Sequence, residues 1–268
     1  MADPITDEHV AAVLRTFVRS CGPMLARLRV EDGDLEDPGA TAEDGEVDRG
    51  RFEQVKARLE RLRYPGSARW RLMAVPERTD WWVNRVGRLT ALAASVTGLA
   101  GALGDRLPLQ DVLGSAGQGL LLCAIASEHG LDDRGARVRL LASVLFERDI
   151  DPAVATGRND SAAADAAVVA ELTNEPPPEE PPKDRRFGVK AAAKWLWRQG
   201  RLLMSITDEL EKRPQGRFYH RALGLLPVVG MAGDYLGERS ALKRVARRGE
   251  RWLAAHPVTG SDLTPERS

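Results

Sequence analysis

The sequence predicts an all-α protein, a multi-helix bundle around a central helical hairpin rich in Gly and Ala. Apolar residues recur at spacings of three and four along most of the chain. No segment alternates polar and apolar residues for long enough to indicate a strand. Two uncharged runs, residues 89–104 and 112–127, each contain 16 residues and must be shielded from water.

The predicted hairpin joins these two runs through the polar segment DRLPLQD, in which Pro108 suits the first turn of the second helix. Each run covers about 24 Å as a helix, less than the roughly 30 Å of a bilayer core. Glycine inside a helix costs about 1 kcal/mol relative to Ala, so the glycines of these runs indicate close helix contacts. The hairpin either forms the core of a soluble bundle or inserts shallowly in a bilayer.

The chain before the hairpin divides into three parts. Residues 1–30 are predicted to hold an amino-terminal helix that starts at Thr6 and bends or ends at Gly22-Pro23. Residues 31–50 are predicted to be a disordered acidic loop, because Glu31 to Asp48 has nine acidic and no basic residues. Residues 51–173 form a helical region that contains the hairpin.

Helix signals also surround the hairpin inside this region. A short amphipathic helix is expected in residues 52–62, and Thr79 can cap the next one. Trp81-Trp82 is either a membrane-interface anchor or a pair of core aromatics. His129-Gly130 is typical of a helix end, and further helices are expected in residues 133–148 and 161–172.

The rest of the chain is expected to pack on the same bundle after a linker. Residues 174–186 are rich in Pro and are predicted to form an extended linker. Residues 187–256 hold two helices, 187–211 and 239–255, on either side of a third uncharged run, and residues 257–268 form a disordered tail. Lys183 to Ser268 has 18 basic against nine acidic residues. These basic groups can face acidic lipid, meet the acidic loop, or simply be solvated.

Composition excludes several classes of function. The net charge of zero argues against a nucleic-acid binder. Only Cys21 and Cys123 are present, and no secretory signal opens the chain, so a reducing, cytoplasmic location is expected. There is no zinc spacing, phosphate loop or GxSxG motif, and Ser240-Ala-Leu-Lys243 matches SxxK without its companion motifs. Neither a metal nor a cofactor is expected.

The candidate functional residues are carboxylates set among apolar residues, namely Asp105, Asp111 and Asp234. A buried carboxylate is costly unless it is paired, so such groups mark functional sites more often than surface ones do. For Asp105 and Asp111, which flank the predicted elbow, capping or solvation is the simpler interpretation. An atypical hydrolase would need a pocket that joins these residues with Ser240.

The order of these segments resembles the EcsC-like proteins of bacteria. The resemblance depends on VTGLAGALGDRLPLQDVLGSAGQGLLLCAIASEHGLDD, then VRLLASVL, then LPVVGMAGDYLG, and it covers roughly residues 80–148 and 187–253. His129 stands where the family usually has Tyr, and Asp234 lies near a common Asn or Asp. His129 therefore joins the candidate residues.

What the resemblance implies is an accessory protein at the cytoplasmic membrane face, linked to an ABC-type exporter, with no catalytic residues to carry over. The function expected from the sequence is therefore a non-enzymatic helical protein that contacts a protein partner or a membrane surface. A soluble helical protein–protein interaction module is the alternative, and an atypical hydrolase is a second one. The sequence leaves the oligomeric state open.

Overall fold

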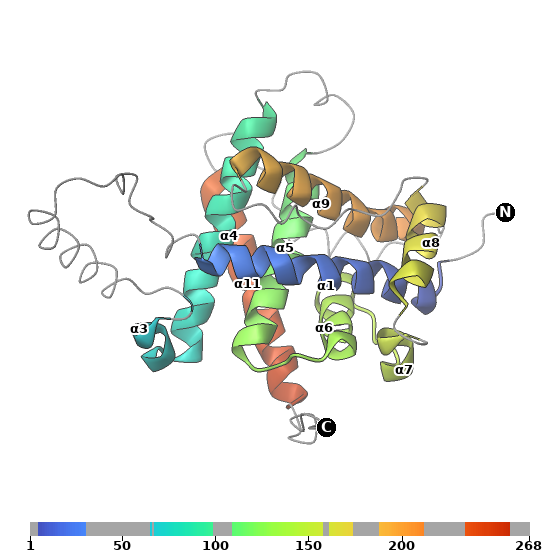
Figure 1. Ribbon diagram of the computed structural model, residues 1–268, viewed down its shortest axis with the longest axis horizontal. Coiled ribbons are helices and arrows are strands. Elements are labelled where there is room, and N and C mark those ends of the chain that lie inside the picture. The colour runs from blue at the N-terminus through green and yellow to red at the C-terminus, as the bar shows by residue number, and fades with distance from the viewer. Residues whose placement is uncertain are drawn as a thin grey trace, which may run out of the picture.

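The computed structural model describes residues 5–30, 65, 67–98, 109–157, 161–173, 188–211 and 234–257. These residues form nine α-helices and no strand, which confirms the all-α prediction. Labelled as in Figure 1, the helices are α1 (Asp7–Val30), α3 (Ala68–Leu72), α4 (Val75–Gly98), α5 (Leu109–Glu128), α6 (Arg134–Phe146), α7 (Pro152–Thr156), α8 (Ala162–Thr173), α9 (Val189–Glu211) and α11 (Asp234–Ala255). The predictions for the acidic loop, the helix at 52–62, the Pro-rich linker, the third uncharged run and the tail lie outside the described residues.

Helix α5 is the axis of the bundle. It contacts α1, α4, α6, α9 and α11, and α1 and α9 cross it in Figure 1. Seven consecutive side chains, from Leu120 to Ala126, have no exposed surface. A helix that is apolar on every side is stable in water only when other helices surround it. The second uncharged run is therefore buried within the chain itself.

The predicted hairpin corresponds to α4 and α5, which pack against each other. Residues 99–108, which hold most of the predicted elbow, lie outside the described residues. At the contact between the two helices, a Cβ on Gly117 would lie 2.7 Å from Cγ2 of Thr90. The small residues of the hairpin therefore permit the close helix packing that their number predicted.

The closest crossing in the described bundle involves Gly200 of α9. A Cβ placed there would lie 1.9 Å from the carbonyl oxygen of Val112 in α5. No side chain fits at that distance, because a carbon and an oxygen in contact require more than 3 Å. Gly200 thus brings the two helix backbones together.

Two helix starts differ from the prediction. Helix α4 begins at Val75, one turn before Thr79, whose hydroxyl oxygen is buried inside the helix. Pro76 explains the earlier start, because proline suits the first turn, where a helix leaves its N–H groups unbonded. Helix α11 begins at Asp234, five residues before the predicted start at Arg239.

Helix α1 continues through Gly22-Pro23 to Val30, so of the two expectations, a bend or an end at this point, the end is wrong. Proline inside a helix removes one backbone hydrogen bond and usually kinks the helix. Here Met24, Leu25 and Leu28 beyond it are at most 4% exposed. Burial of these three side chains offsets the cost of Pro23 and keeps the segment helical.

Helices α6, α8 and α9 fall close to their predicted ranges, whereas the five-residue helices α3 and α7 were not predicted. Helix α7 has a clear local cause, since Asp151 caps it and Pro152 occupies its first turn. No helix among the described residues combines the length and apolar character needed to cross a bilayer.

Candidate functional site

The structure separates the candidate residues that it describes. Asp111 lies in the first turn of α5, where partial burial raises the pKa of its carboxyl. His129 is exposed and follows the other end of the same helix. Their separation of 18 positions corresponds to about 27 Å of helix. Asp111 and His129 therefore cannot act on one small substrate.

The described residues do not extend this pair into a site. Asp105 lies outside the described residues, and Asp234 is the first residue of α11, with no described side-chain position. Ser240 and Lys243 are exposed on the same helix. Among the described residues, no three His, Cys, Asp or Glu side chains lie close enough to hold a metal ion.

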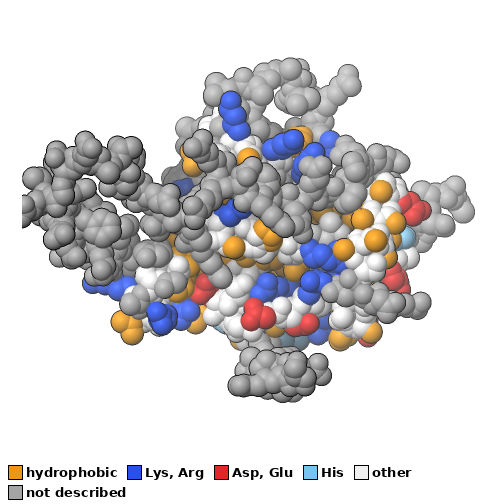
Figure 2. All heavy atoms as spheres, viewed as in Figure 1, with side chains coloured by type: hydrophobic (Ala, Val, Ile, Leu, Met, Phe, Trp, Pro, Cys, Tyr) orange, Lys and Arg blue, Asp and Glu red, His pale blue; other side chains and the backbone are white. Residues whose placement is uncertain are grey.

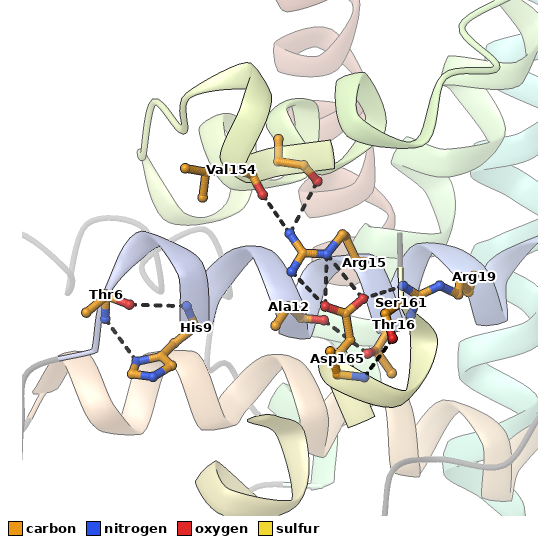
Figure 3. Close-up of polar contacts among 11 residues, drawn as sticks. Thr6, His9, Ala12, Arg15, Thr16, Arg19, Val154, Ser161 and Asp165 are labelled. Atoms are coloured by element: carbon orange, nitrogen blue, oxygen red, sulfur yellow. Dashed lines mark hydrogen bonds and ion pairs between the residues drawn. The ribbon is translucent and has the colours of Figure 1, made fainter. Parts of the chain in front are cut away.

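A buried charged cluster that was not predicted joins α1, α7 and α8 (Figure 3). Asp165 of α8 is 4% exposed and pairs with Arg15 and Arg19 of α1. Arg15 donates from Nη2 to Asp165 Oδ1 at 2.6 Å and from Nε at 3.0 Å. Its third nitrogen donates to the carbonyl oxygen of Val154 at 2.6 Å. A single carboxylate thus orients two guanidinium groups.

This cluster has the features of a structural ion-pair network that connects helices. Both oxygens of Asp165 accept hydrogen bonds from arginine. Gly157 after α7 has φ of 81°, and a Cβ there would lie 2.9 Å from Cζ of Arg15. The backbone at Gly157 lies close to Arg15, and both oxygens of Asp165 accept hydrogen bonds from arginine. We infer that these interactions hold α1, α7 and α8 together.

A second cluster joins the start of α4 to the end of α5. Glu128 accepts a hydrogen bond from Trp82 Nε1 at 3.0 Å and pairs with Arg78 at 3.2 Å. Trp82 is fully buried, and Trp81 makes edge contacts with Trp70 and Trp82. Trp82 is therefore a core aromatic, and Trp81 is partly buried against the same core.

The two cysteines are the only described nucleophilic thiols, and both are buried and free. They lie on α1 and α5, and the thiol of Cys21 is in hydrogen-bond contact with that of Cys123. Burial, together with this contact, raises the pKa of Cys21 well above its ordinary value, and the charge of Arg137 opposes the shift. A thiol kept protonated in an apolar core is a poor nucleophile.

Sequence reasoning missed these clusters although one signal was present. Asp165 is the only charged residue between Ser161 and Ala170, which is the pattern that selected Asp105 and Asp111. Arg15 likewise interrupts the apolar face of α1. Their pairing across 150 residues has no local signature, so only the fold reveals it.

Comparison of the chain with protein-family models, with curated proteins and with solved structures finds no match. The EcsC-like resemblance therefore stays a prediction.

Proposed function

We propose that this chain is a non-enzymatic helical protein of the EcsC-like type that serves as an accessory protein at the cytoplasmic face of a membrane. In line with the resemblance, its protein partner there is an ABC-type exporter. The proposal depends on the resemblance of the sequence, and the structure adds that Leu120 to Ala126 of α5 are fully covered by the chain's own helices and offer no surface to a partner or to lipid. Contacts with a partner or with lipid then fall to the outer faces of the surrounding helices.

The buried charges support a binding role over a catalytic one. Asp165 and Glu128 each accept hydrogen bonds from side chains of another helix, and both are used to join helices. Asp111 and His129 lie at opposite ends of α5. The buried ion pairs and hydrogen bonds of the described residues thus stabilise the bundle, and we assign recognition to its surface.

Fractionation of gently lysed cells that express the full chain tests the proposal. We expect part of the protein to sediment with membranes and a high-salt wash to release it, since no described helix can span a bilayer. Recovery of the protein entirely in the soluble fraction, with no binding to liposomes of any composition, would contradict a role at the membrane.

The second candidate function is a soluble helical module that binds another protein. One observation favours it: Leu72 and Leu92 are the large hydrophobic side chains exposed among the described residues, and they lie on different helices. On the face shown in Figure 2, hydrophobic side chains lie scattered among basic and acidic ones. This candidate predicts a monodisperse protein without detergent that copurifies with a protein partner in the absence of membranes.

A further inference from the structure

Helix α11 has six basic residues, more than any other described helix. Its three acidic residues, Asp234, Glu238 and Glu250, leave a net charge of +3 over the whole helix, and the net charge from Arg239 to Arg251 is +5. Helix α9 also has an exposed basic stripe, but its three acidic residues near the carboxyl end leave a net charge of +1 over the whole helix. Of the two carboxyl-terminal helices, α11 thus carries the larger net positive charge.

The basic side chains of α11 point outward from the bundle. Lys243, Arg247 and Arg251 are exposed and recur every four residues, so they form one stripe about 12 Å long. Within the described part of the chain, Lys243 and Arg247 make no ion pair. Arg251 donates to the backbone carbonyl of Arg247, which leaves its charge uncompensated by that contact.

The opposite face of α11 is already used by the bundle. Leu242, Val245 and Leu253 are at most 5% exposed, and a Cβ on Gly249 would lie 2.7 Å from Leu122 of α5. An amphipathic helix that inserts into a bilayer must bury its apolar face there. Helix α11 cannot do so while the fold is intact, so only its charges are available.

We propose that the exposed basic stripe of α11, formed by Lys243, Arg247 and Arg251, adsorbs the protein on the headgroups of anionic lipids without insertion. This inference rests on the proposed membrane role and names the surface and the lipid chemistry. Basic residues displayed on one helix face gain energy near a negatively charged leaflet.

The test is a vesicle flotation assay with the full chain and two matched charge reversals. Lys243→Glu with Arg247→Glu alters the α11 stripe, and Lys190→Glu with Lys194→Glu alters exposed positions at the same spacing on α9. Each pair changes the net charge by the same amount. We expect wild-type protein to bind phosphatidylglycerol-containing vesicles but not pure phosphatidylcholine vesicles. Removal of each basic group should weaken binding roughly fivefold, so the α11 double variant should bind at least about 30-fold more weakly than wild type. We expect the α9 pair to bind like wild type.

The outcomes separate the surface from the membrane role. Binding that survives the α11 reversal, falls equally in both pairs, or extends to neutral vesicles would overturn the assignment to α11 while the membrane role stands. Binding to no vesicle at all would remove both. Binding only to a soluble polyanion such as heparin would overturn the lipid assignment in favour of an acidic macromolecule. Unchanged circular dichroism and thermal midpoints of the variants exclude misfolding as the cause.

Discussion

Replacing Gly200 with Ala tests the packing of the central helix. The new Cβ would lie 1.9 Å from the carbonyl oxygen of Val112 and 2.7 Å from its Cγ1. Because the oxygen belongs to the backbone of a buried helix, relief requires α9 and α5 to separate. Overpacking of this kind costs about 1–3 kcal/mol, and the backbone contact places it at the upper end. The higher helix propensity of Ala offsets about 1 kcal/mol of this loss in stability. We expect a net loss of about 2 kcal/mol.

Gly87→Ala is the matched control, since it also changes a buried glycine inside a helix. A Cβ at Gly87 would meet Leu242 at 3.4 Å, an ordinary contact. This variant should be as stable as wild type or gain up to about 1 kcal/mol. Urea denaturation followed by circular dichroism measures both free energies of unfolding. A Gly200→Ala protein as stable as wild type, or an equal loss in both variants, would refute the described crossing of α5 and α9.

Three further predictions concern the buried polar groups. Asp165→Asn leaves two guanidinium groups without their counter-charge and should lower the free energy of unfolding by about 3–5 kcal/mol. Asp149→Asn changes an exposed ion pair and should have little effect. An equal loss of stability in both variants would argue against a structural role of the Asp165 ion pairs. Burial raises the pKa of Asp111, so the native state binds more protons than the unfolded state and this residue lowers stability as the pH rises above about 4. Asp111→Asn should therefore gain stability relative to wild type between pH 3 and pH 7 in urea titrations, and a relative loss would contradict the shift. The thiols of Cys21 and Cys123 should resist Ellman's reagent in the native protein and react fully in denaturant.

The sequence predicted the helices whose burial follows a local pattern. In α5 the absence of charge over 16 residues required burial on every side, and the structure buries Leu120 to Ala126 completely. In α6 the spacing of Val138, Leu141 and Val144 identified the inward face, and Asp133 caps the helix. Such features depend on neighbours in the sequence, so they can be read before the fold is known.

The features that sequence reasoning missed depend on contacts distant in the chain. Helix α1 does not end at Gly22-Pro23, one of the two outcomes expected there, because Met24 and Leu28 pack into the core. Asp165 pairs with Arg15 across 150 residues, so no spacing rule connects them. For the candidate site, the sequence supplied isolated residues with unusual surroundings, and the described fold places Asp111 and His129 at opposite ends of one helix.

Hydrogen–deuterium exchange of the full chain tests most directly whether α5 is the enclosed axis of the bundle. We expect the amides from Leu120 to Ala126 to exchange most slowly and only through global unfolding, with the same protection when anionic vesicles are added. Rapid exchange of this segment, or a change in its protection on vesicle binding, would show that α5 opens to solvent or lipid and is not enclosed by the bundle.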